Sequence, residues 1–233
     1  MSVYTISDLH LPLGIDKPMD VFGTVWENYT EKLRENWQTA VSEDDTVVIG
    51  GDFCWATYIE QAYKDFEFLS VLPGKKVILK GNHDYWWTTK KKMDEFVQAN
   101  KFNNIDFLQN NSYIVKAGGR DIGICGTRGW SMPNAKDYDA AIFSREVQRL
   151  ELSIQSAADK ADEIIVFMHY PPVSSDYLTT GFTEVMNRYG IKKCIYGHLH
   201  AKAHSFALQG DVNGIEYTLV SADYMNFMPL KII

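Results

Sequence analysis

The sequence predicts an α/β fold in which short buried strands alternate with amphipathic helices. Three observations predict it: apolar runs too short for a helix recur along the chain, segments with apolar residues at helical spacing separate them, and glycine-containing turns join further strands. Alternation of this kind favours a largely parallel sheet covered by helices, and the hairpins make that sheet mixed, with antiparallel additions.

In the first half of the chain, apolar and β-branched runs at residues 3–7, 46–50 and 77–80 predict three buried strands. Between them, residues 26–40 and 59–69 repeat apolar side chains every three or four positions and predict two helices. Thr88 and Thr89 are typical of a helix start, and we expect the three lysines that follow to lie on a solvated helix face.

In the second half, residues 112–125 predict a hairpin that turns at Gly118 and Gly119. Residues 143–157 predict a helix, and the runs at 122–126, 164–168 and 194–196 predict strands. We expect a second hairpin near the C-terminus, with arms at residues 203–208 and 215–220 joined through residues 209–214.

Composition places the chain among ordinary globular proteins. Of its 233 residues 45% are hydrophobic and 23% charged, which excludes disordered and fibrous classes. The formal net charge of −7 argues against a broad nucleic-acid surface. No repeat or linker divides the chain, so we expect one domain over residues 1–233. Three widely separated cysteines and the lack of a long apolar run indicate a cytoplasmic protein without a membrane segment.

At five strand ends a residue of a metal-ligating type follows the apolar segment within two positions. In chain order these candidates are Asp8 and His10; Asp52; Asn82, His83 and Asp84; His169; and His198 and His200. Open α/β sheets bind ligands beyond the carboxyl ends of their strands, so we expect these side chains to meet in one crevice.

Without His83 and Asp84, this set offers two carboxylates, one amide oxygen and four imidazoles, which are too many ligands for one tetrahedral ion. We therefore expect two divalent ions. A carboxylate can bridge two ions where a neutral imidazole cannot, and Asp52, alone on its strand end after two glycines, is the natural bridge. Two ions against two carboxylates leave the pocket positive, so the substrate should be anionic.

Taken singly, each motif also has a structural explanation. A strand-end aspartate can belong to a cap or turn, and a lone histidine such as His169 is often a packed side chain. The Gly-Asn-His-Asp motif at residues 81–84 is more specific. The order and strand-end placement of all five motifs together favour the functional interpretation.

The series D-x-H, GD, GNHD, H and GH-x-H, which extends from Asp8 to His200, resembles the calcineurin-like metallophosphoesterases. The resemblance implies a four-layer α/β/β/α sandwich with two mixed sheets. It implies one metal held by Asp8, His10, Asp52 and His200, and another held by Asp52, Asn82, His169 and His198. It also implies that His83 stabilises or protonates the leaving group and that Asp84 orients His83. The ions would be manganese, iron, zinc or cobalt, of which we favour manganese.

One position departs from that family pattern. Many members carry an aspartate or asparagine three residues after the bridging aspartate, where this chain has Trp55. We expect Trp55 to reshape the edge of the pocket. Cys54, next to it, is expected to be a packed core thiol.

The expected activity is hydrolysis of phosphate mono- or diesters by attack of a metal-bridging hydroxide, with His83 assisting the leaving group. The substrate would be a phosphorylated small molecule, a nucleotide or a phosphoprotein. Arg128, Trp86 and Trp87 are candidates for substrate binding, with simple exposure of the arginine and core packing of the tryptophans as alternatives. The alternative function is a catalytically weak scaffold of the same fold that binds proteins, which the complete ligand set disfavours. The sequence does not predict the oligomeric state.

Overall fold

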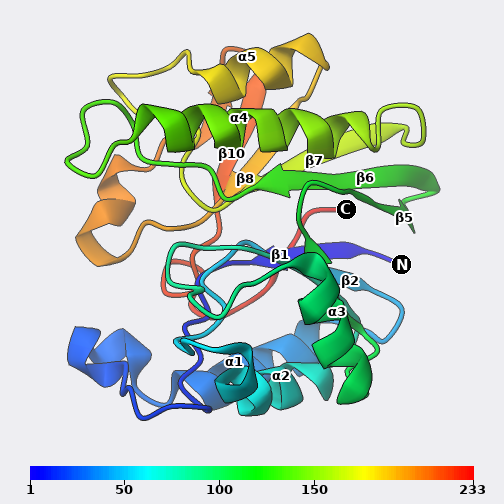
Figure 1. The fold of residues 1–233 in the computed structure, drawn as a ribbon, viewed down its shortest axis with the longest axis vertical. Coiled ribbons are helices and arrows are strands. Elements are labelled where there is room, and N and C mark those ends of the chain that lie inside the picture. Colours follow the sequence, from blue (N-terminus) through cyan, green and yellow to red (C-terminus); the bar gives the residue numbers. More distant parts are fainter.

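Two β-sheets lie face to face, and helices cover the outer face of each sheet (Figure 1). The computed structural model describes residues 1–233. The helices are α1 (Tyr29–Ala40), α2 (Tyr63–Ser70), α3 (Lys90–Ala99), α4 (Ala140–Gln155) and α5 (Gly181–Arg188), and the 3-10 turns are η1 (Asp20–Phe22), η2 (Thr24–Trp26), η3 (Ile59–Ala62) and η4 (Ala201–Phe206). Helices α1, α2 and α3 cover the first sheet, and α4 and α5 cover the second (Figure 1). The α/β sandwich with two mixed sheets is confirmed.

The first sheet has five strands, of which four are parallel. In spatial order they are β11 (Leu230–Lys231), β1 (Val3–Ile6), β2 (Thr46–Ile49), β3 (Lys75–Leu79) and β4 (Ile105–Leu108). Only β11 is antiparallel, and it pairs with β1 at the edge of the sheet. The carboxyl ends of β1, β2 and β3 therefore meet at one edge of this sheet.

The second sheet has six strands with an antiparallel strand at each edge. In spatial order they are β5 (Tyr113–Ala117), β6 (Arg120–Thr127), β7 (Glu163–Met168), β8 (Lys193–Tyr196), β10 (Ile215–Leu219) and β9 (Gly210–Val212). The four central strands are parallel to one another. The carboxyl ends of β7 and β8 thus also share one edge.

A backbone link joins those two edges. Ser7, directly after β1, bridges in parallel to Ser221, and the N–H of Ser7 donates to the carbonyl of Val220 over 2.9 Å. Because β1 belongs to the first sheet and β10 to the second, this link brings the strand ends of both sheets to the same side of the molecule.

Three apolar clusters fill the spaces between the four layers. Val48 and Val77 from the first sheet and Ile165 from the second belong to the cluster between the sheets. Alternate strand residues such as Ile49 face the other way, into the cluster beneath α1 to α3, and Cys125 belongs to the cluster beneath α4 and α5. Strands buried on both faces account for the continuous apolar runs in the sequence.

Side-chain caps mark the starts of α3, α4 and α5. Asp139 accepts hydrogen bonds from two backbone N–H groups in the first turn of α4, at 2.8 and 2.9 Å. Thr89 caps α3 by accepting from the N–H of Lys92, which confirms the predicted helix start. In α1, Leu33 and Trp37 are four residues apart and both fully buried.

The predicted second hairpin is only half correct. Residues 215–220 supply β10, but residues 203–208 fall largely in η4, and the pairing strand is β9. Asn213 and Gly214 have φ of 55° and 83° and form a two-residue turn directly between the paired residues Val212 and Ile215. An Asn-Gly turn closes a hairpin tightly, so the first arm begins later than predicted. The Gly118–Gly119 hairpin is confirmed.

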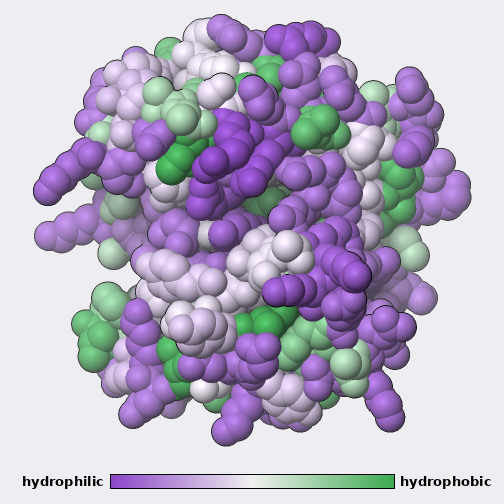
Figure 2. Space-filling model, viewed as in Figure 1, coloured by the Kyte–Doolittle hydropathy of each residue, from purple (hydrophilic) through white to green (hydrophobic).

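Strands β4 and β11 and helix α5 were not among the predicted elements. None of the helices combines the length and apolar character that a membrane-spanning helix requires. The face shown in Figure 2 is mostly hydrophilic, with apolar residues in small separate patches.

Candidate metal centre

The five sequence motifs meet at the shared edge of the two sheets. The first three follow β1, β2 and β3 of the first sheet, and the last two follow β7 and β8 of the second. The expected convergence is therefore present: Asp8 lies 3.2 Å from His200, and Asn82 lies 2.6 Å from His169, although 192 and 87 positions separate these pairs in the chain.

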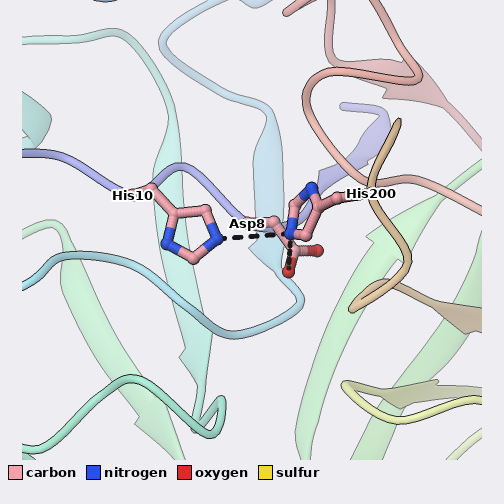
Figure 3. A group of neighbouring side chains, drawn as sticks. All are labelled: Asp8, His10 and His200. Atoms are coloured by element: carbon pink, nitrogen blue, oxygen red, sulfur yellow. Dashed lines mark hydrogen bonds and ion pairs between the residues drawn. The ribbon is translucent and has the colours of Figure 1, made fainter. Parts of the chain in front are cut away.

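The first group of side chains contains Asp8, His10 and His200 (Figure 3). The Nε2 atoms of His10 and His200 lie 3.3 Å apart, and Nε2 of His200 is 3.2 Å from Oδ1 of Asp8. In Figure 3 the two dashed lines run from Nε2 of His200, one to the His10 ring and one to the Asp8 carboxylate. The donor atoms of the group all lie within 4.8 Å of one another, so they could hold one metal ion.

The second group is built around His169. Its Nε2 atom lies 2.6 Å from Oδ1 of Asn82 and 3.2 Å from Nδ1 of His198, and that Nδ1 is 2.9 Å from the same amide oxygen. Nδ1 of His169 donates to the carbonyl of Gly50 over 3.1 Å, which leaves Nε2 free to bind an ion.

Asp52 stands between the two groups. Its Oδ2 atom lies 3.8 Å from Nε2 of His10 and 3.5 Å from Nε2 of His169, while Oδ1 accepts a hydrogen bond of 2.7 Å from the N–H of His83. Asp8, Asp52 and His169 also bring their donor atoms within 4.8 Å of one another. Asp8 thus also lies close to the second group, although the family resemblance implies that it binds only the first ion.

The backbone is strained where these side chains are presented. Asp8, His10, Asp52 and His198 have φ of 61°, 46°, 51° and 72°, in the left-handed region that non-glycine residues rarely adopt. Such conformations persist only where the surrounding structure holds them, and they concentrate at functional sites. A Cβ atom on Gly197 would lie 2.3 Å from Oδ2 of Asp8, so only glycine fits there.

Burial keeps three of the imidazoles neutral. It lowers the pKa of His10 to about 3 and that of His198 to about 4, and it holds the pKa of His169 well below its ordinary value. Neutral imidazoles carry a free lone pair and no charge that would repel a cation. The donor set, nitrogen and oxygen without sulfur, therefore fits divalent metal ions.

His200 behaves differently because two carboxylates face it. Burial alone would lower its pKa, but Asp8 and a hydrogen bond of 2.9 Å from Nδ1 to Asp223 raise that pKa to about 10. The same pairing holds the pKa of Asp8 below its ordinary value although burial opposes it. Asp223 also accepts from the N–H of Ala201 over 3.0 Å. Sequence reasoning missed Asp223, since no motif marks it.

Asp84 does not orient His83. Its carboxylate accepts hydrogen bonds from the backbone N–H groups of Asp52, Phe53 and Gly81 at 2.9, 2.9 and 2.7 Å, and it has no hydrogen bond to the His83 ring. The sequence prediction for this residue is corrected accordingly: Asp84 fixes the loop that carries Asp52. Burial raises the pKa of Asp84 to about 6, although the hydrogen bonds from these N–H groups lower it.

The aromatic residues of the sequence analysis have three different positions. Trp86 is 2% exposed, donates to Asp84 over 3.1 Å and packs in the core, so the expectation that it binds substrate is wrong. Trp55 stacks on His10 at 4.6 Å between ring centroids and lies 4.7 Å from His83, at the predicted pocket edge. Cys54 is buried and free. Trp87 lines a separate pocket.

An apolar pocket opens beside the first group. It has a volume of about 230 Å³ and is lined by His10, His83, His200, Trp26, Trp55, Met19, Phe22, Val25, Ala201 and Asp223. Its apolar wall comes largely from η1 and η2, where Phe22 is 57% and Val25 40% exposed. The pocket thus places an apolar surface beside the His83 ring.

The chain belongs to the calcineurin-like phosphoesterase family, whose sequence pattern it matches over residues 1–202. The family acts on phosphoester bonds with the help of metal ions, so this protein is a hydrolase of such bonds, and its substrates are phosphorylated.

Solved structures show the same fold at low sequence identity. A phosphopantetheinyl hydrolase from Mycobacterium tuberculosis has a TM-score of 0.57 and 12% identity, over 100% of this chain and 95% of that one. A protein of unknown function from Aquifex aeolicus has a TM-score of 0.54 and 16% identity, over 99% and 95%. GAP50, the anchor in the inner membrane complex of Plasmodium, has a TM-score of 0.54 and 12% identity, over 96% and 72%. A comparison with curated proteins found no match.

Proposed function

We propose that the protein hydrolyses phosphate mono- or diesters at a centre of two divalent metal ions. The position of Asp52 carries this proposal. One of its oxygen atoms lies within 3.8 Å of an imidazole nitrogen in each of the two groups, those of His10 and His169. A carboxylate in that position is suited to bridge two ions.

In this proposal each ion has four protein ligands. One ion is held by Asp8, His10, Asp52 and His200, and the other by Asp52, Asn82, His169 and His198. The donors are nitrogen and oxygen atoms, which suit manganese, iron, zinc or cobalt, and manganese is our first choice. Bound there, the ions would supply a water of lowered pKa as the nucleophile and would offset negative charge on the phosphoryl oxygens.

His83 is the residue placed to assist the leaving group. It is half-buried on the wall of the apolar pocket, and its backbone is held by Asp52. Burial, together with the nearby cation of Lys17, lowers its pKa, which makes its protonated form a stronger acid toward a departing oxygen. Trp55 packs against this ring and restricts its position.

The apolar pocket indicates the class of leaving group. Trp26, Trp55 and Phe22 line it next to His83, so a departing alcohol with an aromatic or apolar body would bury surface there. Nucleotides and aryl esters satisfy this description better than a small polar alcohol. We therefore place nucleotides first among the phosphorylated small molecules and phosphoproteins that the chemistry admits.

The direct test compares p-nitrophenyl phosphate with bis-p-nitrophenyl phosphate, both hydrolysed by manganese-loaded protein. The Asp52→Asn variant serves as the blank for contaminating phosphatase. Activity on either ester that the variant lacks is the expected result, and the preferred ester assigns the substrate class. If neither ester reacts with manganese, iron, zinc or cobalt, the activity proposed here is wrong, and the protein-binding scaffold becomes the better account.

A further inference from the structure

A second pocket lies where β3, β4 and β6 end beneath α4. It has a volume of about 180 Å³, and its lining includes Lys80, Trp87, Thr127, Arg128, Glu146 and Arg149. None of the proposed metal ligands is among these residues. Arg128 and Trp87, both expected from the sequence to contact substrate, line this pocket and not the one beside His83.

The pocket is strongly positive although the whole protein is negative. Lys80, Arg128 and Arg149 give it three positive charges, and Glu146 gives it one negative charge, which leaves a surplus of two. The chain as a whole carries a formal charge of −7. A local surplus of this size attracts an anion, and an anion of charge −2 would neutralise it.

Glu146 aligns the two guanidinium groups. Its side chain is 1% exposed and accepts hydrogen bonds from Thr127 Oγ1 at 2.6 Å, Arg128 Nη2 at 3.3 Å and Arg149 Nη1 at 2.7 Å. Each guanidinium has five N–H donors and uses one of them here. The Nε atom of Arg128 is buried and has no partner. The two guanidinium groups are thus held in place, and most of their N–H donors remain available to a ligand.

Lys80 is the third cation and has no partner at all. Its ammonium group forms no hydrogen bond or ion pair, in contrast to Lys75 at the start of β3, which pairs with Asp106 at 2.8 Å. This half-buried ammonium, beside two aligned arginines, is therefore available to an anion from outside the chain.

We propose that this pocket is a second anion site, which binds a phosphate-sized dianion through Lys80, Arg128 and Arg149. The guanidinium forks match tetrahedral oxyanions in geometry, and the ammonium adds a point charge. The anion is either free phosphate or a second phosphoryl group of the substrate, because both present the same oxygens.

Two backbone links connect the pocket to the segments of the metal centre. Lys80 directly precedes the Gly81–Asn82 segment, and the carbonyl of Arg128 accepts a hydrogen bond of 2.8 Å from the N–H of Tyr170, the residue after His169. The backbone thus connects Lys80 and Arg128 directly to the segments that carry two proposed ligands, Asn82 and His169.

Calorimetric titration of inorganic phosphate tests the site separately from catalysis. The full chain carries Asp52→Asn in every sample, so that binding at the metal centre is weakened. Phosphate should bind with about one equivalent, and adding Lys80→Met or Arg149→Gln should weaken its binding about tenfold or more, as expected for loss of a charge-assisted hydrogen bond. Arg145→Gln, an exposed arginine on α4 outside the pocket, is the matched control and should change little.

Two results would overturn the proposal: no phosphate binding by the Asp52→Asn chain, or equal affinities in the Lys80→Met, Arg149→Gln and Arg145→Gln backgrounds. Thermal unfolding identifies any variant that does not fold, and the two pocket variants check each other. Failure of the phosphoesterase assay leaves this test unaffected.

Kinetics with otherwise native protein then distinguishes the two sources of the anion. The measured quantity is the ratio of KM for adenosine 3′,5′-bisphosphate to KM for adenosine 5′-monophosphate. A rise of about fivefold or more in Lys80→Met assigns the site to the second phosphoryl group of a substrate. An unchanged ratio, together with the calorimetric loss, assigns it to free phosphate.

Discussion

At the scale of single residues, the centre depends on side chains that hold the proposed ligands as much as on those ligands. Asp223 accepts from Nδ1 of His200 over 2.9 Å, which turns Nε2 toward Asp8 and His10. His169 is held in the same way by the carbonyl of Gly50. In both cases one ring nitrogen is occupied by the protein and the other is left for an ion.

Replacing Asp223 with asparagine should therefore weaken metal binding. We expect the affinity for manganese to fall by about 10- to 100-fold, the range found when the partner of a ligating histidine is lost. Manganese titration followed by the electron paramagnetic resonance of the free ion measures this. Asp159→Asn, at an exposed aspartate without partners, is the control. Equal affinities in the two variants would contradict the role given to Asp223.

The role of His83 can be separated from metal binding. His83→Ala should leave metal content intact and lower turnover most for esters with poor leaving groups, because a departing alkoxide of high pKa needs a proton most. A series of aryl phosphates of graded leaving-group pKa measures this. An equal loss across the series would remove the proton-donating role.

Single residues also show how much of the site could be predicted from the sequence. All seven proposed ligands could be predicted because each follows an apolar strand in a recognisable motif. Asp223 and the true contacts of Asp84 could not, because the fold brings them to the site: Asp84 reaches Asp52, 32 positions away, rather than its neighbour His83. Short-range sequence order does not predict which of several N–H groups a carboxylate will reach.

At the scale of elements, β3 carries a lysine in an unusual place. Lys76 is fully buried, donates to the carbonyl of Leu72, and has a pKa lowered by burial to about 8, with Glu43 opposing the shift. The unfolded chain still binds this proton up to a pH of about 10.5. The folded protein has already lost it above pH 8, so the unfolding free energy rises with pH in that interval.

The rise due to Lys76 between pH 8 and 10.5 should amount to about 3 kcal/mol at most, since each unit of pKa difference is worth about 1.4 kcal/mol. Denaturant unfolding at pH 7.5 and 10 measures it. The rise should be missing in Lys76→Met and kept in Lys75→Met, whose lysine is exposed on the same strand. A rise of the same size in both variants would show that Lys76 is not its source.

Helices and strands were predicted correctly where one hydrophobic periodicity dominates the segment. A strand was misplaced where the type of turn decides where that strand begins. The apolar runs of β1, β2, β3, β6, β7 and β8 were all predicted, because strands buried on both faces leave a continuous signal. The first arm of the second hairpin was wrongly predicted at residues 203–208. The two-residue turn at Asn213 and Gly214 places that arm directly before the turn, in the three residues of β9.

At the scale of the whole molecule, the N-terminal and C-terminal segments of the chain together link the two sheets. It leaves β10 in the second sheet and returns to pair β11 with β1 in the first, and Ser7 bridges to Ser221 on the way. The apolar cluster between the sheets contains residues from both. Separation of the two sheets would expose that cluster to water.

We therefore predict one cooperative unfolding transition, as expected for a single domain. Trp26, Trp37, Trp55, Trp86 and Trp87 lie in the first half of the chain, so tryptophan fluorescence reports mainly on that half, while far-ultraviolet circular dichroism reports on all helices and strands. The two denaturant curves should coincide. Separate midpoints would indicate that the two sheets unfold independently.

The layered architecture shows the limit of pattern arguments. Alternation of strands and helices predicts one mixed sheet, whereas the division into two sheets came from the family resemblance. The reason is physical: a strand buried between a helix and a sheet has the same apolar pattern as one buried between two helices. The bridge between Ser7 and Ser221, which joins the sheets, leaves no signal in the sequence.

The central claim is that the shared edge of the two sheets binds a pair of metal ions bridged by Asp52. The most direct test is the manganese content of the purified, manganese-saturated chain by inductively coupled plasma mass spectrometry, compared with that of Asp52→Asn. The account predicts two ions per chain in the native protein and fewer in the variant. One ion or none in the native protein, or full occupancy in the variant, would contradict it.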